Sequence, residues 1–287
     1  LPLITSCSPG WIKFCEHYFP EMTENLSTCK SPQQMFGALF KTYYAEKMGW
    51  DPKDIVFVSA IPCTAKKFEV GRAGQSAAGV PDVDYAITTR ELGRMIKAAG
   101  IDFRNIAEEP FDDPFNVSSG AGVIFGATGG VMEAALRTAA EIILQKPLEK
   151  LDFPEVRGTE GIKLASYKLG DATVNVAVTS GTGNAKKLLR AVQSGEVKVD
   201  FIEVMACPGG CVNGGGQPYQ PASVRNNVDL RALRAAVLYK EDAQRDLRKS
   251  HENSALKKIY DEYFGEPNSH KAHEILHTTY VKRGLYK

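Results

Sequence analysis

Two cysteines, Cys207 and Cys211, lie in a glycine-rich stretch whose side chains could bind a soft metal. Residues 203–216 read Glu-Val-Met-Ala-Cys-Pro-Gly-Gly-Cys-Val-Asn-Gly-Gly-Gly. Glycines let the backbone turn tightly and present its N–H groups. Thiolates suit zinc, copper(I) or iron–sulfur clusters. We therefore expect a metal-binding loop. The alternative is two buried structural cysteines in a turn, but a turn needs neither a cysteine pair nor three successive glycines.

Cys7 and Cys63 also follow apolar runs. The run Ile55–Ile61 is continuous, which is typical of a strand covered on both faces. The run at 200–205 leads in the same way to Cys207. Because ligands of open α/β sheets collect at the carboxyl ends of strands, we expect the cysteine loops to converge. About four thiolates would suit a cubane iron–sulfur cluster. Zinc could use the same number, but zinc sites usually present close cysteine pairs.

The elements that must position these loops alternate between strands and helices. A strand at 174–179, a glycine turn and a helix at 184–192 lead into the strand at 200–205. This order predicts a parallel βαβ unit. Another strand is predicted at 84–89. We expect an α/β fold with two lobes of mainly parallel sheet flanked by helices, and the metal site in the cleft between them.

Helices are predicted near both ends of the chain. Ser31 precedes a proline and has a glutamine three positions later, which is the signature of a capped helix start. That helix should run to about Met48. From Asp229 onward the sequence is helical in pattern and strongly charged. We expect residues 229–287 to form a helical C-terminal segment packed on the outside of the domain.

Composition excludes several classes of protein. The 287 residues carry a formal net charge of +1, so no strong field favours nucleic acid. No apolar run reaches the length of a membrane span. Six cysteines in a chain of this length do not form a disulfide framework, and they favour a reducing, cytoplasmic setting. Because the chain begins at Leu1 without methionine, we expect an upstream portion to be missing, and any targeting signal with it.

Three segments, in order, resemble the motifs of the catalytic H-cluster domain of FeFe hydrogenases. Thr5–Trp11, Thr-Ser-Cys-Ser-Pro-Gly-Trp, resembles the family's Thr-Ser-Cys-Cys-Pro-x-Trp. Residues 61–69 resemble its Met-Pro-Cys-x-x-Lys-x-x-Glu. Residues 203–216 match Glu-x-Met-Ala-Cys-x-x-Gly-Cys-x-x-Gly-Gly-Gly in full. The segments 125–137 and 250–253 also look like family sequence, so the resemblance covers nearly the whole chain.

The resemblance implies a six-iron H-cluster, in which a 4Fe–4S cubane is joined to a di-iron subcluster. The di-iron subcluster carries CO, cyanide and an azadithiolate. By motif position, Cys63, Cys207 and Cys211 would ligate the cubane, with Cys211 bridging to the di-iron unit. The resemblance also implies an H-cluster domain at residues 1–228 and a C-terminal segment of small-subunit type at 229–287.

Further roles follow from the same resemblance. Lys66 would hold a cyanide through its buried ammonium, whose charge only the anionic ligands would stabilise. Cys7 would pass protons to the cluster, with Ser27 behind it. The residues expected around the di-iron unit, as contacts to cyanide and CO or as walls that exclude water, are Ser31, Gln33, Phe125 and Met205.

Two positions depart from the family pattern. The cysteine that would be the fourth cubane ligand is Ser8 in this chain. A serine oxygen is a harder ligand than a thiolate and must lose its proton to bind iron. The cubane could be ligated by Ser8, capped by Cys7 or left with an open iron, and we favour Ser8 or the open iron. Ile61 replaces a methionine, which removes a polarizable wall of the site.

The expected function is a hydrogenase that interconverts protons, electrons and H₂. The resemblance implies a ferredoxin or another iron–sulfur donor as electron partner, and maturation proteins that build the di-iron unit. One alternative is a hydrogen or redox sensor with weakened catalysis. The other is an iron–sulfur assembly protein without the di-iron unit, against which Lys66 and the complete third motif argue.

Overall fold

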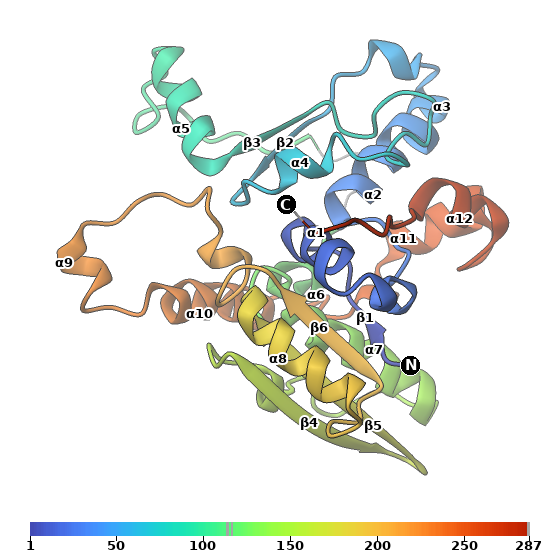
Figure 1. Ribbon diagram of the computed structural model, residues 1–287. Helices are drawn as coiled ribbons and strands as arrows, with labels where there is room; N and C mark the ends of the chain where they lie inside the picture. Colours follow the sequence, from blue (N-terminus) through green and yellow to red (C-terminus); the bar gives the residue numbers. More distant parts are fainter. Residues whose placement is uncertain (113–114, 116, 286–287) are drawn as a thin grey trace.

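The chain forms two β-sheets, and strands of both sheets lead into the loops that contain cysteines (Figure 1). The computed structural model describes residues 1–112, 115 and 117–285. The larger sheet has the strand order β1-β6-β5-β4, and the smaller sheet pairs β2 with β3. The strands are β1 (Leu3–Ile4), β2 (Val58–Ile61), β3 (Tyr85–Thr88), β4 (Ile162–Leu169), β5 (Ala172–Ser180) and β6 (Phe201–Met205).

The larger sheet contains the predicted parallel unit. Strand β5, helix α8 (Thr182–Gln193) and strand β6 follow one another, and β5 pairs with β6 in parallel. Strand β1 lies parallel to β6 on its other side, with Ile4 opposite Ile202. Strand β4 forms an antiparallel hairpin with β5, which the sequence analysis did not predict. The mainly parallel α/β architecture is confirmed.

Both faces of the larger sheet are covered, which explains the apolar run of β6. On one face, α1 (Pro9–Tyr18) and α8 pack Trp11 and Leu189 against Ile202. On the other face, α7 (Gly130–Leu144) packs Met132 against Val178. Figure 1 shows α8 and α7 on opposite sides of this sheet. Strand β6 is therefore central, with one hydrogen-bonded neighbour on each side.

The smaller sheet corrects one prediction. The run 55–61 forms a strand only from Val58, and that strand is not covered on both faces. Val58 is 48% exposed and Tyr85, its partner on β3, is 62% exposed. Helices α4 (Lys66–Glu69) and α5 (Thr89–Ala98) pack against the sheet, but alternate side chains of β2 point to solvent. An apolar run shows that a strand could be buried, but it does not show whether another element of the fold covers that strand.

The predicted helix after Ser31 is confirmed as α2 (Pro32–Leu39), a π-helical turn at Phe40–Tyr44 and α3 (Ala45–Met48). Of the two hydrogen bonds expected from the predicted cap, only one is present. The Gln34 N–H donates to Ser31 Oγ at 3.5 Å, but the side chain of Gln34 is buried without a hydrogen-bond partner among the described residues. The Ser31 hydroxyl instead donates to Glu69, which draws this helix start toward α4.

The C-terminal segment is helical, as predicted, although residues 286–287 lie outside the described part of the chain. Besides short turns it contains α10 (Leu230–Ala243), α11 (Ser254–Ile259) and α12 (His270–Leu276). Helix α10 packs on α6 (Gly120–Ile124), and α12 packs on α2. The remaining short elements are α9 (Ala222–Arg225), the 3-10 turns Pro20–Asn25, Pro52–Asp54, Pro154–Val156, Cys211–Asn213 and Ser250–Glu252, and the π-helical turn Tyr260–Phe264.

A buried ion-pair network ties the C-terminal segment to the sheet domain. The Arg137 side chain on α7 is fully buried, and its guanidinium contacts Asp242 of α10 and Glu133, both at 2.7–2.8 Å. Arg248 also pairs with Asp242, at 2.7 Å. Within the described ranges, no helix is both long and apolar enough to cross a membrane.

We predict that Asp242→Asn destabilises the fold by about 3 kcal/mol, because it removes one of the two carboxylates that compensate the buried Arg137 charge and also a partner of Arg248. The neighbouring Glu241 pairs with Arg245 at the surface, so Glu241→Gln should lower the free energy of unfolding by at most about 0.5 kcal/mol. Urea denaturation of the two variants measures both values. Equal losses in the two variants would contradict the importance of the buried network.

Candidate metal centre

One cavity between the two sheets gathers side chains from three loops. The loops follow β1, β2 and β6, so each delivers residues at the carboxyl end of a strand. Among the residues that line the cavity are Cys7, Ser8, Cys63, Lys66, Met205, Cys207 and Cys211. The structure thus brings together all four cysteines that the sequence analysis selected.

Glycines let the loops after β2 and β6 meet at backbone contact. A Cβ on Gly214 would lie 2.0 Å from the Pro62 carbonyl oxygen. The Gly216 N–H donates to the same oxygen at 3.0 Å, and a Cβ there would lie 2.8 Å from the Thr88 side chain. Side chains at these two positions would therefore push the loops apart. The three successive glycines bring Cys63 and Cys211 to the same cavity.

A second glycine loop backs the cysteine pair from the other side. The Val212 N–H donates to the Gly126 carbonyl at 2.9 Å, and the Thr128 N–H donates to the Gly209 carbonyl at 3.1 Å. Gly210 has φ +95°, and a Cβ there would lie 2.6 Å from the Thr128 nitrogen. The loop after β6 is therefore held on both sides by backbone contacts.

The described thiols of the cavity are not gathered as closely as the ligands of a single zinc ion. Burial raises the pKa of the Cys7 thiol to about 11 and that of Cys211 to about 12, although Lys66 lowers both. In the described part of the chain, no three of these cysteine sulfurs lie within 4.8 Å of one another. Zinc–sulfur bonds of about 2.3 Å would place the sulfurs about 4 Å apart. A cubane holds its ligands farther apart.

Lys66 is buried, and its ammonium is already paired. Its Nζ donates to the Cys7 carbonyl at 3.0 Å and to the Glu69 carboxylate at 2.9 Å. The side chains of the pair are only 7% and 6% exposed. The expectation that only anionic ligands would stabilise the buried ammonium is therefore wrong, because Glu69 does so within the protein. This role of Glu69 was not predicted from the sequence, although the spacing of the pair on one helix turn signals it.

Ser31 and Gln33 reach the cavity indirectly, through Glu69. The Ser31 hydroxyl donates to Glu69 Oε2 at 2.8 Å, and the Gln33 amide donates to the same oxygen at 3.3 Å. The Gln33 oxygen accepts from the Ser59 hydroxyl at 2.8 Å. Neither side chain is among those that line the cavity. They form a buried network behind the Lys66 ammonium.

Ser27 and Phe125 also lie outside the cavity lining. The Ser27 hydroxyl accepts from the Cys29 N–H at 3.3 Å, and Phe125 ends helix α6. Ser8, in contrast, faces the cavity, and its hydroxyl accepts from the Ala206 N–H at 3.2 Å. The serine oxygen is therefore held next to the backbone that leads into Cys207.

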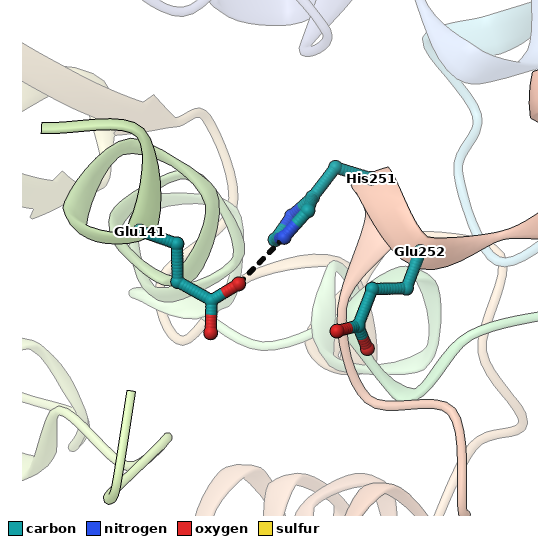
Figure 2. Close-up of side chains that lie close together, drawn as sticks. All are labelled: Glu141, His251 and Glu252. Carbon is teal, nitrogen blue, oxygen red and sulfur yellow. Dashed lines mark hydrogen bonds and ion pairs between the residues drawn. The ribbon is translucent and has the colours of Figure 1, made fainter. Parts of the chain in front are cut away.

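A second group of possible metal ligands lies away from this cavity. Glu141 on α7 and His251 and Glu252 place ligand atoms within 4.8 Å of one another (Figure 2). His251 Nε2 lies 2.7 Å from Glu141 Oε2. The Lys249 ammonium lies 3.0 Å from Glu141 Oε1 and also pairs with Glu252. Because the lysine already contacts both carboxylates, we interpret this group as an ion-pair cluster that holds the C-terminal segment on α7.

Several thiols held apart in one cavity, at strand ends of an α/β fold, are typical of an iron–sulfur protein. The comparison with protein families identifies which one. The family model described as "Iron only hydrogenase large subunit, C-terminal domain" matches residues 1–215, and "Iron hydrogenase small subunit" matches residues 228–283. The chain belongs to the iron-only hydrogenase family, as the sequence motifs predicted.

Individual relatives agree. The chain is 51% identical over 283 residues to NADP-reducing hydrogenase subunit HndD of Solidesulfovibrio fructosivorans, covering 99% of this chain and 48% of the relative. It is 49% identical over 281 residues to iron hydrogenase 1 of Clostridium pasteurianum, covering 98% and 49%. The chain therefore spans about half the length of these curated relatives.

A solved structure confirms the fold. A variant of the [FeFe]-hydrogenase HydA1 from Chlamydomonas reinhardtii superposes with a TM-score of 0.82 at 44% identity, covering 99% of this chain and 77% of that chain.

A more distant relative is a cytosolic Fe-S cluster assembly factor of Danio rerio, narfl. It is 29% identical over 288 residues, covering 98% of this chain and 68% of the relative.

The ion-pair cluster of Figure 2 generates a prediction about pH. Burial raises the pKa of Glu141, but the Leu148 N–H, Lys249 and His251 lower it more, to about 2. A carboxyl with a lowered pKa stabilises the fold above its unfolded value near 4.5, and this stability disappears as pH falls toward 2. Glu141→Gln should therefore destabilise the protein at pH 7 and have less effect at pH 3. Urea denaturation at the two pH values measures the difference.

The control is Glu149→Gln, which changes an exposed carboxyl near the end of the same helix. It should leave the unfolding free energy nearly unchanged at both pH values. A destabilisation by Glu141→Gln that is the same at pH 7 and pH 3 would contradict the assigned ion pairs.

Proposed function

We propose that this chain is the catalytic domain of an FeFe hydrogenase, which interconverts 2H⁺ and 2e⁻ with H₂. The observation that carries the proposal is a single cavity with four cysteines, Ser8 and Lys66, in a chain that matches the family over residues 1–215. When bound, the H-cluster, a 4Fe–4S cubane with a di-iron subcluster carrying CO, cyanide and azadithiolate, supplies the redox chemistry. The protein residues bind it, exclude water and move protons.

In this proposal Cys63, Cys207 and Cys211 would hold the cubane through their thiolates, and Cys211 would also bind the di-iron unit. Ser8 is the fourth ligand, or it faces an open iron. The Ala206 N–H supports Ser8, because a hydrogen bond at 3.2 Å to its oxygen would stabilise negative charge there. Cys7 and Ser8 both line the cavity, and we favour Ser8 as the ligand because a Cys7 bound to iron would lose its proposed role in proton transfer.

Cys7 is the proposed proton carrier. Burial keeps the pKa of its thiol near 11, so the group holds a proton at neutral pH. Ser27 is proposed to follow it in the proton path. Met205 is 2% exposed and lines the cavity, which suits a wall that excludes water. Phe125 is proposed as a second wall, although it lies outside the lining of the cavity.

Lys66 is proposed to hold a cyanide ligand, and Ser31 and Gln33 to contact cyanide and CO. All three share Glu69 as a hydrogen-bond partner. A carboxylate that binds all three fixes their positions relative to one another. The protein thereby keeps a positive charge close to the cavity without leaving it unpaired in a low-dielectric environment.

The wider setting follows from the same proposal. Residues 1–228 form the H-cluster domain and residues 229–287 a segment of small-subunit type, with matches of the family models to 1–215 and 228–283 in support. The proposed partners are a ferredoxin or another iron–sulfur donor, and the maturation proteins that build the di-iron unit. A reducing, cytoplasmic setting is proposed because all six cysteines are free.

Infrared spectroscopy of the matured protein tests this proposal. Bands of bound CO and cyanide, together with hydrogen turnover, are expected for the enzyme. Bands without appreciable turnover would instead indicate a hydrogen or redox sensor. A cubane without these bands would indicate an iron–sulfur assembly protein, the alternative that the 29% identical relative keeps open.

The proposed role of Lys66 can be tested by mutation. Lys66→Ala should weaken retention of the di-iron unit, seen as loss of infrared bands, while the cubane stays. Lys67→Ala is the matched control, because the neighbouring Lys67 pairs with Glu91 at the surface. Lys66→Arg keeps the charge and the Glu69 pair, and should retain more of the bands than Lys66→Ala. Wild-type bands and turnover in Lys66→Ala would reject the role.

The proposed role of Ser8 can also be tested by mutation. An oxygen donor favours oxidised iron, so a cubane with Ser8 as ligand should be harder to reduce than one with four thiolates. Ser8→Cys should therefore raise the midpoint potential of the cubane, measured by redox titration in protein that carries the cubane alone. Cys7→Ala, the control, should leave that potential near the wild-type value. An unchanged potential in Ser8→Cys would show that Ser8 does not bind the iron.

A further inference from the structure

Glu203 is a carboxylic acid in the centre of the larger sheet. It lies on β6, between apolar neighbours, and its side chain is 0% exposed. A buried carboxylate is unfavourable unless hydrogen bonds or charges compensate it. It does not line the metal cavity, although Met205 on the same strand does. A charged residue at this place therefore needs a structural or functional reason.

The compensation comes from the start of helix α7. Glu203 Oε1 accepts from the Gly129 N–H at 2.6 Å, and Oε2 accepts from the Met132 N–H at 2.7 Å. The residue before the helix is Gly129, which has no side chain to cap it. A Cβ at Gly129 would lie 1.9 Å from the Val156 carbonyl oxygen, so no capping residue could replace the glycine. Glu203 supplies the missing acceptors from another element.

The loop that Glu203 holds is the loop that backs the cysteine pair. Gly126 and Thr128 are hydrogen-bonded to the backbone of Val212 and Gly209, at 2.9 and 3.1 Å. The path from Glu203 to the cysteine loop begins at its carboxylate, which accepts from the Gly129 and Met132 N–H groups, and continues through the backbone hydrogen bonds of Gly126 and Thr128. Phe125 belongs to the same stretch of chain.

We propose that Glu203 is a positioning residue for the cluster: its carboxylate ties the loop 125–132 to β6 and thereby fixes the Cys207–Cys211 loop. This inference rests on the proposed function, since it assumes that the two cysteines bind a cubane. Glu203 acts through the glycine loop and touches no reacting atom.

The test uses the full chain reconstituted with the 4Fe–4S cubane alone, so it does not depend on the di-iron unit or on turnover. Glu203→Gln keeps the shape but replaces one acceptor by an N–H₂ group that faces a backbone N–H. Loss of such a buried hydrogen bond should speed the release of cubane iron to a chelator about tenfold. The EPR signal of the reduced cubane should shift as its ligands move.

The matched control is Glu133→Gln. Glu133 lies on α7, the helix whose start Glu203 holds, and it is as buried as Glu203. It pairs with Arg137 and Arg157 instead of the glycine loop. It should lower thermal stability and leave iron release and the EPR signal unchanged. Equal effects of the two variants on the cubane would overturn the proposal, because general destabilisation would then explain both.

Hydrogen exchange in the metal-free protein gives a second readout. The amides of Thr128 and Val212 should exchange faster in Glu203→Gln than in the wild type or in Glu133→Gln. Wild-type exchange at these amides together with wild-type iron release would also overturn the proposal. If Glu203→Gln does not fold, Glu203→Asp, which keeps the charge but is one methylene shorter, takes its place with the same expectations.

These measurements distinguish failure of the proposed function from failure of the proposed role of Glu203. A wild-type chain that binds no cubane would contradict the proposed function, and the exchange measurement would still decide whether Glu203 fixes the loop. A wild-type chain that binds the cubane while Glu203→Gln behaves identically would contradict only the role of Glu203.

Discussion

The structure depends on the close approach of three loops, two that follow β1 and β6 of the larger sheet and one that follows β2 of the smaller sheet. The contact of Gly214 and Gly216 with the Pro62 carbonyl leaves no room for a side chain. Loops of ordinary composition would stay several ångströms apart, and their cysteines would face solvent instead of a common cavity. The glycines contribute no metal ligand, but their backbone geometry decides whether the ligands meet.

Around that contact the protein buries charges in compensated groups. Lys66 is paired with Glu69, Glu203 accepts two backbone N–H groups, and Arg137 is paired with two carboxylates. Lys66 and Glu69 lie on one helix turn, whereas Glu203 joins β6 to α7 and Arg137 joins α7 to α10. Each group would be unfavourable if one partner were removed. Apolar residues could fill the same space. Paired charges add a fixed geometry, which a binding site for a large inorganic group requires.

The sequence predicted the central strand, the βαβ unit and the convergence of the cysteine loops, because apolar runs and glycines are local signals. It did not predict β4, whose alternating side chains lie at the edge of the sheet. It overestimated the burial of Val58, since coverage depends on neighbours that a local pattern does not reveal. It recognised Lys66 through a motif but not its partner Glu69. The spacing of Lys66 and Glu69 on α4 signals that pair, whereas the hydrogen bonds from Ser31 and Gln33 to Glu69 exist only once α2 and α4 pack together.

The pairing of β1 with β6 has a consequence for the order of folding. Ile4 forms a bridge with the nearby Leu26, but Leu3 lies opposite Phe201, so about 200 residues must be synthesised before β1 can join the larger sheet. Contacts between residues so far apart in sequence form slowly, because a long loop must close first. Until β6 emerges from the ribosome, the loop that contains Cys7 lacks this sheet partner. The cavity that joins Cys7 to Cys207 and Cys211 is therefore complete only after β6 and the glycine-rich loop that follows it have been synthesised.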